Sequence, residues 1–190
     1  MFINTKQHVC YMQTLEILCS EKKTKLLEWL LFNPTTKIKI RTISKTLGIN
    51  AGYVSTVVKN LDTIGIVKNN LIDFDNPSTR SLKIYFNIEK VKEAVKRVKN
   101  KSVTGIGVYG SWAKGTNIED SDLDLWIKTK KEISVKELSE IRSTIREISE
   151  VHKVSIIVLT KERLQEIKNM DGIFYASLLN SFRLRGEFVD

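Results

Sequence analysis

The chain has 190 residues, of which 42% are hydrophobic and 28% are charged, and its formal net charge is +9. This composition argues against wholesale disorder, and no apolar run approaches the roughly 20 residues that a membrane-spanning helix needs. The length suits one large domain or two small ones.

Polar residues interrupt the first 20 positions, which argues against a signal peptide. The two cysteines, Cys10 and Cys19, lack the spacing of a metal site or a redox pair, and the two histidines, His8 and His152, are too far apart in sequence to indicate a metal site. We therefore expect a cytoplasmic protein with two reduced thiols and no membrane partner.

Positive charge is concentrated in the first half of the sequence. Residues 1–101 hold 18 Lys and Arg against 8 Asp and Glu, whereas residues 102–190 hold 13 against 14. A basic module favours a polyanionic partner such as nucleic acid, because binding releases condensed counterions. The alternative is a solvated lysine-rich surface with no such partner.

The first half opens with helical patterns. Leucines between residues 26 and 31 form one stripe of a helix that begins at Glu21 and is stopped by Asn33-Pro34. A second helix is predicted over 41–47, and Asn50 is suited to cap a third, which ends at Gly65. Two β-rich runs follow, at 66–74 and 82–88, with a turn-prone segment between them.

This order, carried by residues 43–61, resembles a winged helix-turn-helix domain over roughly residues 21–88. The resemblance implies double-stranded DNA as a partner, although such folds also bind proteins. Helical periodicity puts Thr56 and Lys59 on the face that would enter the major groove. No arginine lies on that face, so we expect weak base specificity. The expected phosphate contacts are Arg41, Lys45, Arg80 and Lys83, together with Lys37 and Lys39.

A short basic helix is predicted over 91–98 and leads into the second half. We therefore expect two domains, residues 1–101 and residues 102–190.

Two polar motifs in the second half lie at the ends of predicted strands. The first strand ends at Gly110-Ser111, and Asp122 and Asp124 alternate with apolar residues in the second, 122–127. Alternation places both carboxylates on one face of the sheet, where they repel unless a cation lies between them. Mg²⁺ accepts such oxygen ligands and phosphate oxygens as well. The Gly-Ser turn offers backbone N–H groups and a hydroxyl to a terminal phosphate.

The run 109–127 resembles the signature of the DNA polymerase β nucleotidyltransferase superfamily, most closely the minimal nucleotidyltransferases of archaea and bacteria. The resemblance implies that Asp122 and Asp124 bind Mg²⁺ or Mn²⁺, and that Gly110 and Ser111 hold a nucleoside triphosphate, with ATP expected. The elements that follow fit the same order: a helix begun by a Ser134–Glu137 capping box, a strand at 154–159, helices at 161–168 and 174–179, and an extended segment at 184–188.

One departure concerns the third carboxylate of the superfamily, which the strand after the capped helix normally supplies. The matching position holds Ser155; Glu150 and Asp171 are the alternative sources of the acid, although neither lies in the expected strand. A weakened metal site would impair two-metal transfer.

The predicted fold is a winged helix-turn-helix followed by a small α/β nucleotidyltransferase domain with a mixed sheet. The predicted function is Mg²⁺-dependent transfer of a nucleoside monophosphate, with AMP expected, to a hydroxyl acceptor. The resemblance favours a protein acceptor such as a HEPN-type partner toxin. The alternative is a DNA-binding regulator or antitoxin whose second domain binds nucleotide or a partner without catalysis.

Overall fold

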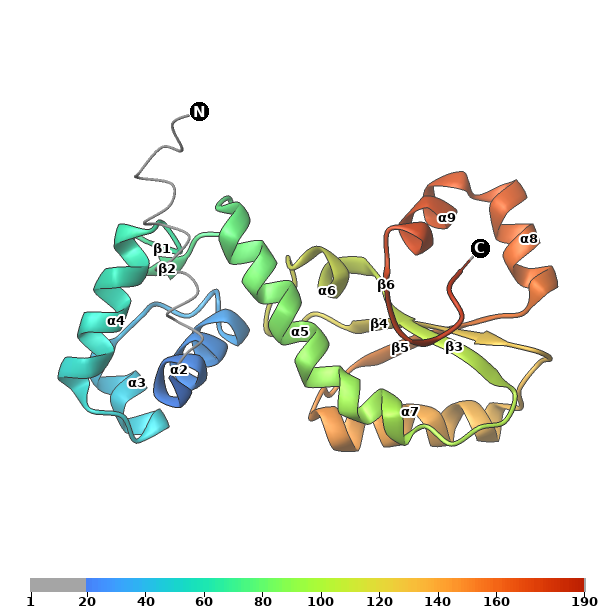
Figure 1. Cartoon of the computed structure of the whole chain (residues 1–190), viewed down its shortest axis with the longest axis horizontal. Coiled ribbons are helices and arrows are strands. Elements are labelled where there is room, and N and C mark those ends of the chain that lie inside the picture. Colours follow the sequence, from blue (N-terminus) through green and yellow to red (C-terminus); the bar gives the residue numbers. More distant parts are fainter. Residues whose placement is uncertain (1–19, 190) are drawn as a thin grey trace, which may run out of the picture. The chain divides into compact units, whose positions relative to one another are not determined.

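The computed structural model describes residues 20–189 and divides the chain into two compact units, Met1–Arg80 and Ser81–Asp190 (Figure 1). His8, Cys10 and Cys19 lie outside the described residues. The division falls inside helix α5 (Pro77–Arg97), whereas the sequence pattern predicts a boundary at residue 101. Within residues 20–189, no helix combines the length and apolar character that crossing a membrane needs.

The first unit contains the three predicted helices, α2 (Glu21–Phe32), α3 (Ile40–Leu47) and α4 (Ala51–Thr63). Gly48 ends α3 in a left-handed conformation, at a φ of 66°. The predicted cap of α4 is confirmed, because the side chain of Asn50 accepts hydrogen bonds from the backbone N–H groups of Gly52 and Tyr53. The buried residues of these helices are Leu26, Leu27, Leu30, Leu31, Ile43, Val54, Val57, Val58 and Leu61.

The predicted wing is much reduced. Strands β1 (Val67–Lys68) and β2 (Leu71–Ile72) pair in antiparallel orientation over two residues each. The second predicted wing strand, 82–88, is wrong, because these residues lie in the long helix α5. Asn76 begins this helix by accepting a hydrogen bond from the N–H of Ser78, 2.9 Å away, and Pro77 occupies the first helical position.

The buried apolar residues of α5 and its C-terminal end recur at helical spacing rather than in strand alternation: Leu82, Phe86, Val91, Ala94, Val95 and Val98. Arg80 and Lys83, which we expected in the wing, therefore lie on this helix. The structural division also redistributes charge, since residues 1–80 carry 11 basic against 6 acidic residues and residues 81–190 carry 20 against 16. Much of the excess of basic over acidic residues that we expected in the first domain therefore lies on α5 and the residues after it.

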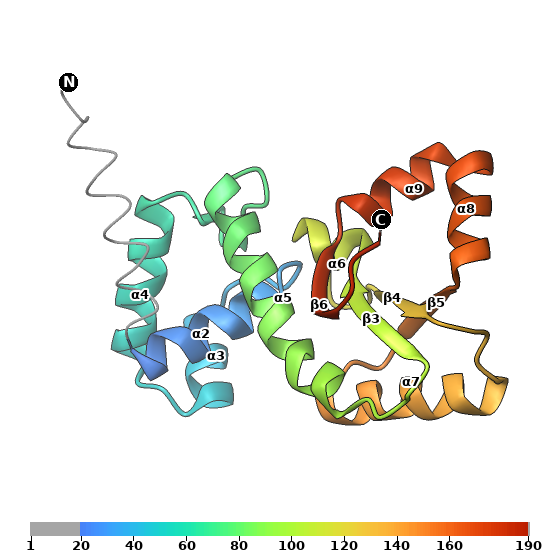
Figure 2. The same cartoon turned by 45° about the vertical axis from the view of Figure 1, so that its right-hand side comes forward.

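The second unit is built on a mixed sheet, as the sequence predicts, with four strands in the order β5-β4-β3-β6. These strands are β3 (Val103–Val108), β4 (Leu123–Thr129), β5 (Val154–Leu159) and β6 (Phe182–Gly186). Strand β3 is antiparallel to both neighbours, whereas β4 and β5 are parallel and joined through α7 (Val135–Ser149). Figures 1 and 2 show α7 on one side of the sheet and α8 (Lys161–Met170) with α9 (Gly172–Leu179) on the other.

Local sequence signals in this unit are confirmed. The Ser134 side chain accepts from the N–H of Glu137, and the Glu137 carboxylate accepts in turn from the N–H of Ser134, 2.8 Å away. This capping box begins α7.

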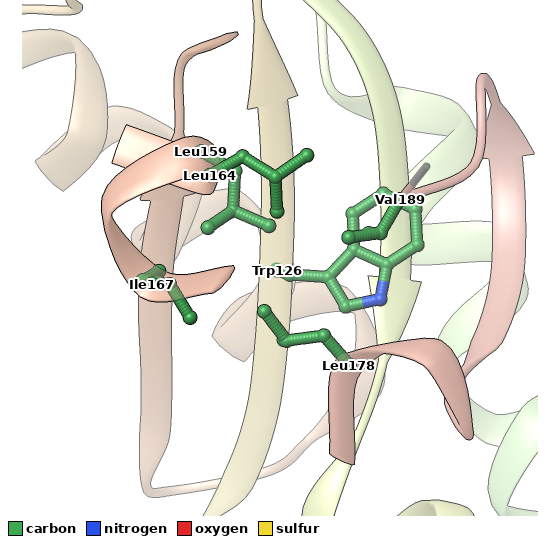
Figure 3. Close-up of a cluster of buried hydrophobic side chains, with 6 residues drawn as sticks. All are labelled: Trp126, Leu159, Leu164, Ile167, Leu178 and Val189. Atoms are coloured by element: carbon green, nitrogen blue, oxygen red, sulfur yellow. The ribbon is translucent and has the colours of Figure 1, made fainter. Parts of the chain in front are cut away.

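Hydrophobic residues of β4, β5, α8, α9 and the C-terminal end form a core between the sheet and helices α8 and α9: Trp126, Leu159, Leu164, Ile167, Leu178 and Val189 (Figure 3).

Trp126 is the centre of this core and has no exposed surface. A Cβ at Gly107 would lie 2.3 Å from the indole ring, so the glycine in β3 leaves the space that the ring fills. The indole Nε1 donates to the hydroxyl of Ser181 at 2.8 Å. Trp126 therefore packs in the core and is not accessible for stacking on a base.

Candidate active site

The turn at the end of β3 begins the short helix α6 (Gly110–Lys114). Gly110 has a φ of 68°, in the left-handed region that side chains other than glycine rarely adopt. Ser111 follows it and is partly exposed, while Trp112 and Ala113 are buried and anchor the helix. The turn thus presents a serine hydroxyl and backbone N–H groups beside the carboxyl-terminal end of β3.

Gly110 and Asp124 lie in direct contact. A Cβ added to Gly110 would lie 2.3 Å from Oδ2 of Asp124 and 3.2 Å from its Cγ. A backbone hydrogen bond also joins the two segments, because the N–H of Tyr109 donates to the carbonyl oxygen of Asp124 at 3.0 Å. The turn and the carboxylate that the sequence motif predicts are therefore adjacent in space.

Asp122 and Asp124 form an electrostatically strained pair. Asp122 precedes β4 and is exposed, whereas Asp124 is partly buried. Burial raises the pKa of Asp124 above its ordinary value, and the charge of Asp122 raises it further. Burial and then the charge of Asp124 also raise the pKa of the Tyr109 phenol. A cation beside Asp124 would lower the pKa of both Asp124 and Tyr109, because it would offset the negative charge that contributes to each shift.

Ser155, which the resemblance aligns with the third carboxylate of the superfamily, lies opposite Asp124 in the sheet. Strands β4 and β5 pair in parallel with Asp124 opposite Ser155 and Leu123 opposite Val154. Residues paired across a sheet project from the same face, so Ser155 lies beside Asp124 on the face of the acid pair. Ser155 is exposed.

No other acid completes the set in the described part of the chain. Glu150 is the exposed C-cap of α7, and the carboxylate of Asp171 caps α9 by accepting from the N–H of Phe174 at 2.8 Å. Among residues 20–189, no group of three or more His, Cys, Asp or Glu side chains is placed to hold a metal ion. The acid pair is therefore not extended to a triad.

The donors that are present suit a divalent ion bound together with a phosphate. Two carboxylates and a serine hydroxyl are hard oxygen ligands of the kind that Mg²⁺ and Mn²⁺ accept. Burial and then the charge of Asp122 raise the pKa of Asp124, and a cation would oppose the second of these effects. Asp122 and Asp124 could hold such an ion, with Ser111 and the turn N–H groups near the phosphates.

Sequence reasoning missed a buried side chain that supports this turn. Asn87 of α5 is 1% exposed, and its amide donates 2.8 Å hydrogen bonds to the carbonyl of Trp112 and to Oδ1 of Asn117. The helical spacing of Leu82, Phe86 and Val91 would have placed Asn87 near the buried face of a helix, had the segment not been assigned to a strand.

The residues expected to contact DNA lie in several environments. Arg41 and Lys45 on α3 and Thr56 and Lys59 on α4 are exposed. Thr56 also donates its hydroxyl hydrogen to the carbonyl of Gly52 at 3.0 Å. Arg80 is exposed on α5, with its Nε donating to the carbonyl of Phe74 at 2.7 Å. Lys83 is fully buried, which corrects its expected role as a phosphate contact.

Comparison with known proteins gives one family match. A family model described as "Polymerase beta, Nucleotidyltransferase" matches residues 89–173. A crystal structure of a provisionally assigned nucleotidyltransferase from Sulfolobus solfataricus is 22% identical, covers 50% of this chain and 86% of that chain, and has a TM-score of 0.37. No curated protein sequence matches the chain. The structural similarity is too low to carry an argument. The family match supports a nucleotidyltransferase-like domain that includes residues 89–173.

Proposed function

We propose that the second unit is a Mg²⁺-dependent nucleotidyltransferase that takes a nucleoside triphosphate, preferably ATP, and transfers its nucleoside monophosphate to a hydroxyl acceptor. The observation that carries this proposal is the contact between Gly110 and the carboxylate of Asp124. It brings a phosphate-suited turn within reach of two carboxylates on one face of a sheet.

Each residue has a separate role in this proposal. Gly110 and Ser111 bind and orient the triphosphate through backbone N–H groups and the serine hydroxyl. Asp122 and Asp124 hold the divalent ion, which supplies charge compensation for the phosphates. The acceptor oxygen forms a bond to the α-phosphorus, the bond to the pyrophosphate oxygen breaks, and the acceptor proton passes to a carboxylate or to solvent.

The proposal also names an acceptor for the nucleotide and a role for the first unit. A hydroxyl of a partner protein, such as a HEPN-type toxin, is the acceptor that the resemblance favours. The first unit binds double-stranded DNA through exposed residues of α3 and α4: Arg41, Lys45, Thr56 and Lys59. A chain with both properties would suit an antitoxin that represses its own gene.

Ser155 supports a second candidate function. A hydroxyl opposite Asp124 lacks the charge of the third acid, which leaves fewer ligands for the ion and no extra base for the acceptor. The second candidate is a regulator that binds DNA and a metal–nucleotide complex without transferring the nucleotide.

Two measurements on the full-length chain separate these functions. Labelled ATP is titrated with Mg²⁺, with Mn²⁺ and with EDTA, using Asp124→Asn as the site variant and Asp171→Asn as a carboxylate control outside the site. Binding that requires the ion and Asp124 supports the site, whereas equal binding in EDTA refutes it. Incorporation of label from α-³²P ATP into acceptor proteins then distinguishes the transferase from the regulator.

A further inference from the structure

The segment between Trp112 and Glu119 connects the two halves of the candidate site. It follows the Gly110-Ser111 turn and leads into Asp122, so its path determines whether turn and acids meet. Only its first three residues, which end the short helix α6, are in regular structure. Buried Trp112 and Ala113 anchor its start, and the irregular residues after them depend on contacts with neighbouring elements.

The hydrogen bonds inside the segment lie near its two ends. The N–H of Thr116 donates to the carbonyl of Ser111 at 3.0 Å. At the other end, the N–H of Ile118 donates to the hydroxyl of Ser121 at 2.9 Å. These bonds close two short turns, but neither ties the segment to the rest of the domain.

Asn87 provides such a tie. Its amide nitrogen donates to the carbonyl of Trp112, two residues after Gly110, and to the side chain of Asn117. Both asparagines are 1% exposed, so water does not replace these bonds. One amide group therefore fixes both the start and the middle of the segment to α5.

The same face of α5 carries a second polar residue. Lys83 lies one helical turn before Asn87, is fully buried, and interacts electrostatically with Glu119 near the end of the segment. Asn87 and Lys83 thus face the segment at its two ends. Burying two polar side chains is costly in a helix whose buried face is otherwise largely apolar, which suggests a role beyond packing.

We propose that Asn87 is a positioning residue for the nucleotide site: it fixes the segment after Gly110-Ser111 so that the turn stays aligned with the acid pair. This inference rests on the proposed function, because the turn has to bind a triphosphate for its alignment to matter. Because Asn87 is 1% exposed, it would act through its hydrogen bonds to the carbonyl of Trp112 and the side chain of Asn117.

The test uses the full-length chain and four variants. Asn87→Ala removes both bonds, and Asn117→Ala removes one of them. Asn100→Ala is the matched control, since it also removes two side-chain hydrogen bonds in the same unit but away from the motif: one donated to Glu137 at 3.0 Å and one accepted from the N–H of Ser102 at 2.8 Å. Asp124→Asn reports loss of the site itself.

Two readouts are measured below the unfolding temperature of every variant. The first is the Kd for Mg²⁺–ATP, and the second is amide hydrogen exchange at Thr116. We expect Asn87→Ala to weaken binding about tenfold to a hundredfold, within the range for removing a partner of a buried polar group. It should also speed exchange at Thr116, with a smaller effect for Asn117→Ala and none for Asn100→Ala.

The outcomes separate this inference from the proposed function. If wild type binds Mg²⁺–ATP and Asn87→Ala binds it with the same Kd, Asn87 does not position the site. Equal loss of affinity in Asn87→Ala and Asn100→Ala also overturns it, because general destabilisation then explains the effect. If wild type binds no Mg²⁺–ATP, the proposed function fails, and exchange at Thr116 alone decides whether Asn87 fixes the segment.

Discussion

The carboxylate of Asp124 packs against the Cα of Gly110, so closely that a Cβ there would lie 2.3 Å from Oδ2. Two requirements for glycine coincide at this position, because the backbone also has a φ of 68°. The contact brings the turn to the acid pair, and any side chain at residue 110 would separate them.

Gly110→Ala should therefore abolish measurable Mg²⁺–ATP binding and lower the free energy of unfolding by about 1–3 kcal/mol, through backbone strain and the clash with Asp124. The measurements are nucleotide titration and urea unfolding. Gly48→Ala is the control for strain alone, since Gly48 has a φ of 66° and open space around it. Gly172→Ala, also in open space but in helix α9, should leave nucleotide binding unchanged and raise the free energy of unfolding by up to about 1 kcal/mol. Normal nucleotide binding by Gly110→Ala would show that the turn does not hold the triphosphate.

Asp124→Asn should stabilise the ion-free protein while removing its response to Mg²⁺–ATP. Burial, and then Asp122, raise the pKa of Asp124, so the folded state binds its proton more tightly than the unfolded state does. Stability contributed by this group is therefore lost as the pH rises through the folded-state pKa. At pH 7 the substitution should raise the free energy of unfolding by about 1 kcal/mol or less, since the group is partly exposed.

The higher free energy of unfolding of Asp124→Asn should disappear below about pH 4, where the wild-type carboxyl group is protonated in both the folded and the unfolded state. Urea unfolding in EDTA at about pH 7 and about pH 3.5 measures the difference. A less stable variant at neutral pH without added ions would mean that the carboxylate stabilises the fold, contrary to the strain that we infer.

The sequence predicts most of the second unit because its signals are local. The capping box of Ser134 and Glu137 and the alternation around Asp122 and Asp124 depend only on neighbouring residues, and the structure contains both the α7 capping box and strand β4. Strands β4 and β5 pair in parallel with Asp124 opposite Ser155, and the assignment of Ser155 to the third-acid position stays a prediction.

Long-range packing explains what the sequence did not predict. Residues 82–88 are rich in β-branched and aromatic side chains, yet they form a helix because Leu82 and Phe86 pack at helical spacing. The start signal of that helix, Asn76-Pro77, was interpreted as a turn. Asn87 was missed for the same reason, since its partners are 25 and 30 residues away.

Lys83 should make stability depend on pH in the alkaline range. Burial lowers its pKa from 10.5 to about 7; the charge of Glu119 opposes this shift and that of Lys90 adds to it. Between these values the unfolded state binds a proton that the folded state lacks, so stability rises with pH by up to about 1.4 kcal/mol per unit. Below about pH 7 the residue is protonated in both states and this slope disappears.

Lys83→Met should remove that slope and stabilise the protein most at or below about pH 7. Urea unfolding of wild type and variant at about pH 6.5, 8 and 9 measures it, with Lys101→Met as an exposed control. An identical pH dependence in wild type and Lys83→Met would contradict a lowered pKa for this lysine.

The full-length chain should bind duplex DNA with steep salt dependence and modest sequence preference. Replacing Arg41, Lys45 and Lys59 together by alanine should reduce the slope of log K against log salt by about 0.9 for each phosphate that is no longer neutralised. The matched control removes Lys130, Lys131 and Lys136, which are exposed in the second unit and carry the same total charge. Equal effects of the two triple variants would indicate attraction by net charge rather than a DNA site on α3 and α4.

The final prediction concerns the position opposite Asp124. If transfer occurs, the missing carboxylate limits it, so Ser155→Asp should raise the rate of nucleotidyl transfer while Asp122→Asn and Asp124→Asn abolish it. A third carboxylate on the same face adds negative charge where the ion sits, and each ~1.4 kcal/mol of additional transition-state stabilisation is a tenfold gain in rate.

Ser155→Asn is the control, because it has the size of aspartate without the charge. The measurement is label incorporated from α-³²P ATP into acceptor proteins by wild type and the four variants. A slower Ser155→Asp in an active protein would show that Ser155 is not the vacant acid position, despite its pairing with Asp124. If every variant and wild type are inert while Mg²⁺-dependent ATP binding persists, the domain is a nucleotide-binding regulator. Restored transfer in Ser155→Asp alone would identify the loss of this single acid as the change that silenced the enzyme.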